Sequence, residues 1–379
     1  MPKKLSGWIL TGVAALTTAA VVAQTPPPSK PPVAQTPAAG KPPVVQTPAA
    51  KPTPTTAPTS ANAATAGQTA AADLAMQVEL DRAGFSPGEI DGRGGSNTKK
   101  ALAAYMEVHK TAPVAGTPTT TYVITDADAA GPFVKVPVDM MAKAKLKTLG
   151  YSSLTEALAE RFHCSPALLT SLNRGVKMAA GATITVPNVI VAAPKSAAAP
   201  AGKAADAPAK GGPTAKPTAT AAPTGGTAAP TGATGAKPAD AAAGSKIVVS
   251  KGQSSLRVLD GSGATIFYAP VTSGSEHDPL PLGVWSVNAV TRNPVFRYNP
   301  DLFWDADEKH TKATIPAGPN GPVGVVWIDL SKEHYGIHGS PEPGKIGYTQ
   351  SHGCVRLTNW DAARLADLVK KGTPVHFVE

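Results

Sequence analysis

The sequence contains very little cysteine: only Cys164 and Cys354 occur in 379 residues. Two thiols are too few for the disulfide framework that holds small secreted scaffolds together, so apolar cores have to stabilise this chain. A single bridge between the two stays open in an exported protein, although it would block any reactive thiol. We expect Cys164 instead to be a small buried apolar side chain.

The segments that can fold also lack a strong charge of one sign. The formal net charge is +9, but Lys3 and Lys4 contribute +2 and the low-complexity residues 24–70 and 191–244 contribute +3 each, which leaves +1 for the rest. No folded segment therefore has the dense basic face of a nucleic-acid-binding protein, and we expect no nucleic acid as a partner. Lysines on extended tethers favour loose contact with an anionic envelope polymer.

Long apolar runs are absent after residue 23. Residues 1–23 combine a basic start, a short apolar run from Trp8 to Val22 and small residues at its end, which is the pattern of a secretory signal peptide. An uncleaved anchor is the alternative, but the run is short for a membrane-spanning helix. We therefore expect export to the periplasm or cell envelope, with no stable membrane span after cleavage.

Two segments rich in alanine and proline, residues 24–70 and 191–244, divide the remainder of the chain. In the first, "PPVAQTPAAGK" recurs as "PPVVQTPAAK", and neither segment has enough large apolar side chains to form a core. We predict that both are disordered linkers, which makes this a multidomain protein. The parts left to fold are residues 71–118, 119–190 and 245–379.

Short apolar runs separated by turn signals dominate residues 245–379. "KIVVS", "SSLRVLD", "ATIFYAPVTSG", "GVWSVNAV", "GVVWIDL" and "PVHFV" predict strands, and "DAARLADLVKK" predicts an amphipathic helix before the last strand. The pattern predicts a mainly-β domain with peripheral helices.

One stretch of this part carries a nucleophile and its partners. Cys354 follows His352 and Gly353, and His338 lies 354 − 338 = 16 residues upstream, followed by Gly339. A Cys/His nucleophile needs a thiol, an imidazole that takes its proton and unhindered backbone N–H groups for the oxyanion. Glycine has no Cβ, so backbone and substrate can approach closely at these positions. Both histidines are candidates for the base.

"IHG…SHGCVRL", together with "PLPLGVWSV", "NPVF", "IPAGPNGPVG" and "YGIHGSPEPGKIG", resembles the catalytic domain of YkuD-type L,D-transpeptidases, which crosslink or edit bacterial peptidoglycan. The resemblance implies a β-sandwich domain and no cofactor. It implies Cys354 as the nucleophile and His338 as the general base, with His352 in the pocket wall. It also implies an oxyanion hole made by the backbone N–H groups of Cys354 and of the residues before it, Gly353 and His352.

Further positions complete the expected site. Ser340, Gly339 or a backbone carbonyl is expected to orient the other nitrogen of His338. Arg356 is suited to hold a substrate carboxylate through a bidentate pair. The other candidate substrate-binding residues are Tyr335 and Ser351, of which Ser351 also fits a turn hydroxyl. Trp304 and Trp327 join Tyr335 as candidate pocket aromatics, with plain core packing as the alternative for each.

Residues 71–118 and 119–190 resemble wall-binding modules. "GFSPGEIDGRGG" between two helical patterns resembles the small α-helical peptidoglycan-binding domain. "LTEALAERFHCSPALLTSLN" before "ATITVPN" resembles a LysM domain, a small α+β fold that binds N-acetylglucosamine chains, although residues 126–151 form an insertion in that pattern. Both resemblances imply glycan strands as partners, and a mere spacer is the alternative for the first module.

The function that the resemblance implies is peptidoglycan L,D-transpeptidation. Cys354 would attack the carbonyl of the third residue of a tetrapeptide stem, release D-Ala and pass the acyl group to an amine of another stem, which gives a 3→3 crosslink. Water or a protein amine as acceptor would give L,D-carboxypeptidase activity or protein anchoring at the same site. The sequence carries no signal for the acceptor or the oligomeric state.

A zinc hydrolase is the alternative from another class of enzyme, because His-x-x-x-His is helix-compatible ligand spacing. Its ligands would come from His334, His338, His352 and Cys354. "HYGIH" contains glycine beside strand-like residues, however, and no H-E-x-x-H motif is present, so we expect no metal. A non-catalytic wall-binding protein is a third class, which the intact Cys/His pair disfavours.

Overall fold

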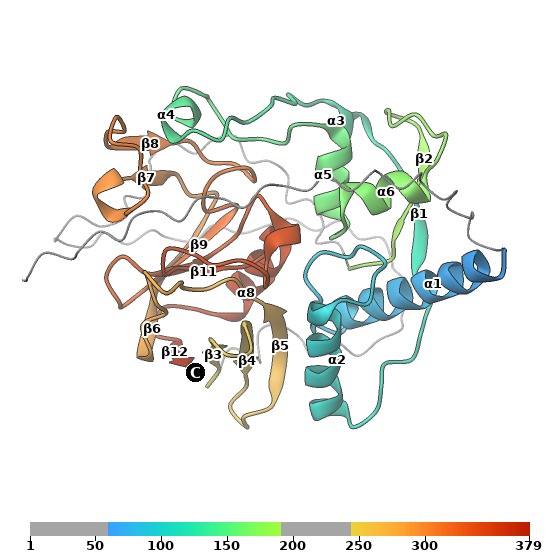
Figure 1. Cartoon of the computed structure of the whole chain (residues 1–379), viewed down its shortest axis with the longest axis horizontal. Helices are drawn as coiled ribbons and strands as arrows, with labels where there is room; N and C mark the ends of the chain where they lie inside the picture. The colour runs from blue at the N-terminus through green and yellow to red at the C-terminus, as the bar shows by residue number, and fades with distance from the viewer. Residues whose placement is uncertain (1–59, 191–243) are drawn as a thin grey trace, which may run out of the picture. The chain divides into compact units, whose positions relative to one another are not determined.

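The computed structural model describes residues 60–190 and 244–379, all within one unit of the chain, residues 58–379 (Figure 1). The predicted signal peptide, most of the first linker and nearly all of the second lie outside the described residues. Helix α1 (Ser60–Arg82) begins inside the range predicted as linker, where alanine, the best helix former, is frequent. No helix in the two described ranges is long and apolar enough to cross a membrane.

One sheet of eight strands dominates the C-terminal part, and the prediction of a mainly-β domain is confirmed. Its spatial order is β11-β10-β9-β6-β12-β3-β4-β5. The strands are β3 (Lys246–Ser250), β4 (Ser255–Leu259), β5 (Thr265–Pro270), β6 (Gly283–Arg292), β9 (Val326–Leu330), β10 (Gly336–His338), β11 (Val355–Arg356) and β12 (Pro374–Val378). The two shortest, β10 and β11, have no apolar run that predicted them.

The sheet is continuous rather than a sandwich of two separately bonded sheets. A register shift between Val287 and Ala289 lets the first half of β6 pair with β12 and its second half with β9. The two outer strands then meet: Thr272, just after β5, exchanges backbone hydrogen bonds of 3.1 and 2.8 Å with Arg356 of β11. The expected sandwich is therefore one sheet folded back on itself around a single core.

Alternating side chains of this sheet fill that core. Ile247 and Val249 of β3 and Ile328 of β9 are fully buried, as the strand period of two requires. Helix α8 (Asn359–Leu368) lies against the same core through Leu365 and its neighbours. Its first residue follows β11 closely, so the packing of α8 fixes where β11 ends.

Residues 60–190 form helices and one small sheet. They are α1, α2 (Ser96–His109), β1 (Thr119–Val123), α3 (Asp126–Ala129), α4 (Met140–Lys143), α5 (Leu154–Arg161), α6 (Pro166–Leu172) and β2 (Thr183–Pro187), with β1 antiparallel to β2. Leu74 and Val78 of α1 are buried with residues from α5, α6 and β2, while Leu80 is buried with α2. The two predicted modules therefore share α1.

The segment after α1 covers the edge of the large sheet. Phe85 forms a parallel bridge with Tyr268 of β5, and Tyr268 exchanges backbone hydrogen bonds of 2.8 and 2.9 Å with Ser86 and Gly84. The Tyr268 side chain is buried among Leu80, Phe85 and α2. An edge strand with unpaired N–H and C=O groups can pair with another chain and cause aggregation. Here residues 84–86 supply hydrogen-bond partners for this edge.

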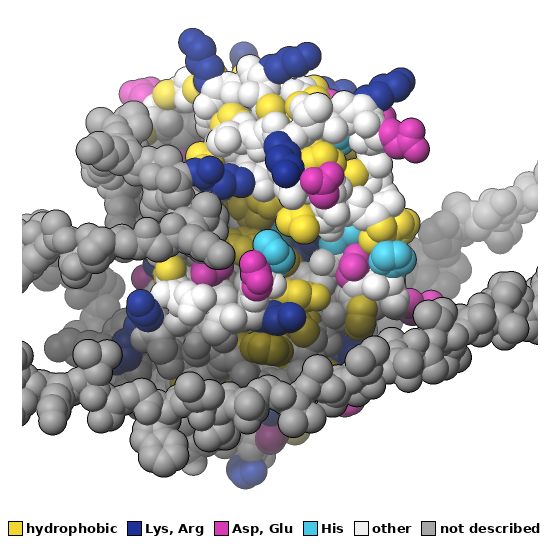
Figure 2. All heavy atoms as spheres, turned by 90° about the vertical axis from the view of Figure 1, so that its left-hand side faces the viewer, with side chains coloured by type: hydrophobic (Ala, Val, Ile, Leu, Met, Phe, Trp, Pro, Cys, Tyr) yellow, Lys and Arg dark blue, Asp and Glu magenta, His cyan; other side chains and the backbone are white. Residues whose placement is uncertain are grey.

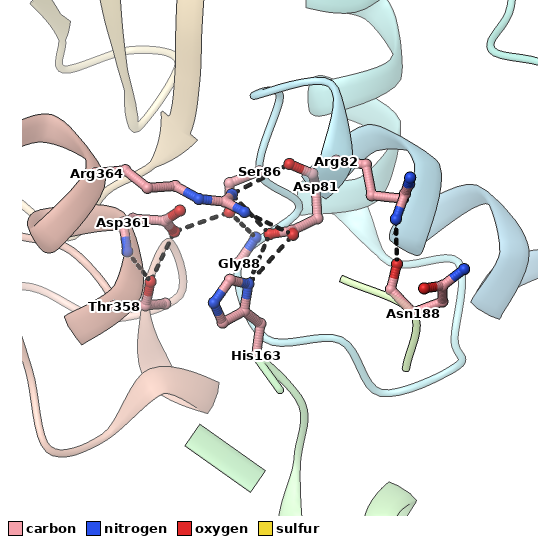
Figure 3. A network of polar contacts seen from close by, with 9 residues as sticks. All are labelled: Asp81, Arg82, Ser86, Gly88, His163, Asn188, Thr358, Asp361 and Arg364. Atoms are coloured by element: carbon pink, nitrogen blue, oxygen red, sulfur yellow. Dashed lines mark hydrogen bonds and ion pairs between the residues drawn. The ribbon is translucent and has the colours of Figure 1, made fainter. Parts of the chain in front are cut away.

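A buried polar network joins the same segments (Figure 3). The Arg364 guanidinium of α8 donates two hydrogen bonds of 2.9 Å to the two carboxylate oxygens of Asp81, which is fully buried at the end of α1. His163 Nδ1 lies 3.2 Å from both oxygens, and its ring stacks on Trp360. Burial alone would raise the pKa of Asp81, but Arg364 and His163 outweigh it and hold that pKa well below its ordinary value.

We predict that Arg364→Ala lowers the free energy of unfolding by about 3 kcal/mol, because removing one partner leaves Asp81 buried and unpaired. Urea denaturation measures the loss. The matched control is Arg257→Ala, which removes another ion pair between the same regions, Arg257–Glu107, at the surface. Its loss should stay below about 1 kcal/mol. Equal losses of unfolding free energy in the two variants would contradict the larger contribution that we assign to the buried pair.

Candidate active site

The parallel pair of β10 and β11 arranges the predicted catalytic residues. Ile337 pairs with Val355 and His338 with Arg356. Because successive side chains alternate between the faces of a sheet, Ile337 and Val355 enter the core and are fully buried. His338 and Arg356 share the opposite face, and Cys354 lies two residues before Arg356, directly ahead of β11.

His338 is buried and held in one tautomer. Its ring stacks on Trp327, with centroids 5.5 Å apart, and Nδ1 lies 2.7 Å from the carbonyl oxygen of Gly339. A carbonyl only accepts, so Nδ1 carries the proton in the neutral ring and Nε2 keeps its lone pair. Gly336 permits this packing, since a Cβ there would lie 2.5 Å from the Trp327 ring.

Burial sets the charge state of both reacting groups. Desolvation, reinforced by the nearby Arg356 charge, lowers the pKa of His338 to about 4, although the Gly339 carbonyl opposes the shift. Desolvation also raises the pKa of Cys354, against a hydrogen bond from the Gly336 backbone and the Arg356 charge. Both shifts favour the uncharged forms at neutral pH, a neutral imidazole and a neutral thiol.

The turn before Cys354 leaves two backbone donors unused. Gly353 has φ = 100°, and a Cβ there would lie 2.8 Å from the Tyr335 ring, so only glycine fits. Ser351 is buried and its hydroxyl donates a 2.6 Å hydrogen bond to the Cys354 carbonyl, which closes the turn. Within the described residues, no hydrogen bond uses the N–H of Gly353 or of Cys354. These are the donors expected for an oxyanion.

The structure separates the two candidates for orienting His338. The Gly339 carbonyl accepts from the ring, while the hydroxyl of buried Ser340 accepts from the Glu342 N–H at 3.2 Å. The Gly339 N–H itself donates to the Val326 carbonyl of β9. Sheet pairing thus holds Gly339, and Gly339 in turn holds the imidazole.

His352 belongs to the wall of the site. Its Nε2 lies 2.8 Å from a carboxylate oxygen of Asp305, and its ring contacts Phe303 and Trp304. Trp304 is 60% exposed and stacks on His277, so core packing, the alternative interpretation, does not apply to it. Asp305 carried no sequence signal, because its partner lies 47 residues away.

Phe303, Trp304 and Asp305 lie in the segment between two short strands. These strands are β7 (Phe296–Tyr298) and β8 (Ala313–Ile315), which pair with each other. Residues 136–149, from the insertion in the LysM-like pattern, pack on these strands, and His310 bridges Tyr298 and Asp139 with contacts of 2.8 and 2.7 Å. On the face that carries β7 and β8, histidine side chains gather around a recess with hydrophobic side chains, and charged side chains stand at its rim (Figure 2).

Two side chains beside the thiol are suited to a substrate. Arg356 Nε is buried and has no hydrogen-bond partner in the described part of the chain. An unmet buried donor of this kind favours an acceptor such as a carboxylate. Tyr335 lies against the turn, and desolvation together with the charges of Cys354 and Asp278 raises its pKa, which keeps its hydroxyl protonated as a donor.

Comparison with known proteins finds similar sequences for the C-terminal part. Residues 244–377 match the YkuD family, the L,D-transpeptidase catalytic domain. Over 57 residues the chain is 51% identical to the putative L,D-transpeptidase YkuD of Bacillus licheniformis. This alignment covers 15% of this chain and 34% of that protein. Over 137 residues it is 28% identical to the probable L,D-transpeptidase YbiS of Escherichia coli, which covers 35% of this chain and 44% of that protein.

The chain thus spans between a third and a half of the length of these two relatives. Among solved structures, an L,D-transpeptidase from Mycobacterium smegmatis aligns with 36% of this chain and 58% of its own, at 22% identity and a TM-score of 0.30.

Among the described residues, no group of three or more His, Cys, Asp or Glu side chains is placed so that it could hold a metal ion. His334, one of the four candidate ligands, contacts the Cys354 thiol only through its backbone carbonyl, at 3.8 Å. Both cysteines are free, and Cys164 is buried as expected, with its pKa raised to about 12, chiefly by desolvation.

We predict that alkylation of Cys354 by iodoacetamide accelerates by about tenfold for each pH unit from neutral pH towards 9.0, because the thiolate fraction limits the rate. The Cys164→Ala variant leaves Cys354 as the only thiol for the measurement. A rate that is already on a plateau at neutral pH would reveal a stable thiolate–imidazolium pair and contradict the neutral pair.

Proposed function

We propose that this protein is a peptidoglycan L,D-transpeptidase that acts through Cys354. The observation that carries the proposal is the His338 ring, whose Nδ1–H is held by the Gly339 carbonyl so that Nε2 keeps its lone pair, and which pairs with Arg356, two residues after Cys354. The YkuD family match over residues 244–377 supports the substrate class. The expected export and the two wall-binding-like modules fit the same substrate and stay predictions.

In the proposed reaction, Cys354 attacks the carbonyl of the third residue of a tetrapeptide stem. The S–C bond forms as His338 Nε2 takes the thiol proton, and the oxyanion is stabilised by the N–H groups of Gly353 and Cys354. Collapse breaks the amide bond to D-Ala, whose amine leaves with the proton from His338. An amine of a second stem then attacks the thioester, loses a proton to His338 and releases the thiol, which leaves the 3→3 crosslink.

Burial keeps the imidazole free to accept a proton but weakens it as a base. With a pKa of about 4 the resting ring stays unprotonated throughout the neutral range, while a base with its pKa nearer to the operating pH would take the thiol proton more readily. The imidazolium formed during attack is short-lived and is best stabilised by the Gly339 carbonyl and the adjacent oxyanion. Arg356 is proposed to hold a carboxylate of the stem, and His352 to shape the wall together with Asp305.

The proposal predicts that the purified protein converts disaccharide-tetrapeptides into a crosslinked dimer with loss of D-Ala, as measured by mass spectrometry. Cys354→Ala should abolish the product while the fold persists, and Cys164→Ala, the matched control, should keep full activity. His338→Ala should lose ~10²–10⁴-fold in rate, the usual value of positioned proton transfer.

The same experiment identifies the acceptor, because hydrolysis yields a tripeptide instead of a dimer. Full crosslinking by Cys354→Ala would refute the nucleophile. No conversion of the tetrapeptide by the unmodified protein would refute the proposed function.

A further inference from the structure

Glu160 and Asn359 connect residues 60–190 with the candidate active site. Asn359 is the first residue of α8 and is almost completely buried. Its side-chain amide donates to both carboxylate oxygens of Glu160, at 3.2 and 3.0 Å, and to the Pro319 carbonyl at 3.1 Å. Glu160 lies at the end of α5, 199 positions away in sequence.

The oxygen of the same Asn359 amide reaches the backbone that orients the histidine. It accepts a 3.1 Å hydrogen bond from the Val325 N–H. It also lies directly against Gly339, where a Cβ would collide with it. Gly339 is the residue whose carbonyl accepts from His338 Nδ1. Asn359 therefore packs against the residue whose carbonyl accepts from the imidazole.

Glu160 is the group that fixes this amide in place. Without a carboxylate acceptor, one buried N–H of Asn359 would be unsatisfied, at a cost that favours rotation of the side chain. A rotated amide would release Val325 and press on the tightly packed Gly339. Tyr151 donates a further hydrogen bond of 2.9 Å to the same carboxylate and helps to hold it in place.

We propose that Glu160, acting through Asn359, is a positioning residue for His338, so that residues 60–190 form part of the catalytic apparatus and are more than a wall anchor. This inference rests on the proposed role of His338 as the base. Glu160 touches neither the thiol nor the imidazole, and its effect passes through Asn359 and the Gly339 carbonyl.

Acylation of Cys354 by p-nitrophenyl acetate tests the inference without any peptidoglycan. The rate is followed by release of nitrophenol from pH 5 to 8 in the full chain, and mass spectrometry locates the acetyl group. Glu160→Ala should lose ~10–100-fold, the usual cost of a misplaced catalytic group. Its residual rate should climb with pH, because hydroxide then has to generate the thiolate.

Two further variants separate positioning from stability. Glu160→Gln keeps an oxygen that accepts from Asn359 and should keep most of the rate with the parental pH profile. Arg364→Ala breaks the neighbouring contact between α8 and α1, so it should melt at a lower temperature yet keep both rate and profile. Glu160→Met fills similar space without an acceptor; it replaces Glu160→Ala if alanine prevents folding, and should show the same loss.

The inference is overturned if the variants without an acceptor at position 160 melt earlier but acylate with an unchanged rate and pH profile, as Arg364→Ala is expected to do. It is equally overturned if Glu160→Gln loses as much rate as Glu160→Ala. A parent protein that acetylates Cys354 with this Glu160 dependence, yet forms no product from tetrapeptides, would refute the proposed function and leave the positioning role standing.

Discussion

The parallel pairing of β10 with β11 brings together side chains that the sequence keeps apart. It aligns His338 with Arg356 and sends Ile337 and Val355 into the core, so the apolar core itself fixes which face carries the reacting groups. A slip of one residue would exchange the two faces and bury the wrong side chains. The two backbone hydrogen bonds between Arg356 and Thr272 give β11 a second partner and stabilise a strand of only two residues.

The second requirement of this site is that side chains can approach the backbone closely at three glycines. Gly336 admits the Trp327 ring, Gly353 admits Tyr335, and Gly339 admits the Asn359 amide. Each glycine leaves space for a rigid neighbour beside His338 or Cys354. The imidazole is thereby enclosed and dehydrated, which lowers its pKa to about 4, while a single carbonyl decides which nitrogen keeps the proton. Desolvation also raises the pKa of the Cys354 thiol and so disfavours the thiolate.

The sequence predicted most of the regular elements, because they depend on local periodicity. The longer strands of the large sheet and α8 lie where the apolar patterns predicted them. The shortest strands escaped prediction, since β10 and β11 contain too few residues to show a period, although they carry the site. The site residues on these two strands were predicted instead from the resemblance of the motif around Cys354 to a known family.

Contacts between segments that lie far apart in the chain could not be predicted from the sequence. Neither Asp305 beside His352 nor Glu160 on Asn359 has a local signal, because only the folded chain brings these pairs together. The packing of residues 60–190 on α8 and β5 was unforeseen for the same reason. Trp304 had two interpretations from the sequence, a pocket aromatic or a core side chain, and only the folded chain shows that it is exposed and stacks on His277.

The most direct test of this account is ¹⁵N NMR of the histidine rings in the full chain, with His338 assigned through His338→Gln. We predict that the His338 ring carries its proton on Nδ1 throughout the neutral range and that it becomes doubly protonated only near pH 4. A ring that titrates near 6.5, or that carries its neutral-state proton on Nε2, would contradict the buried neutral base on which the proposed chemistry depends.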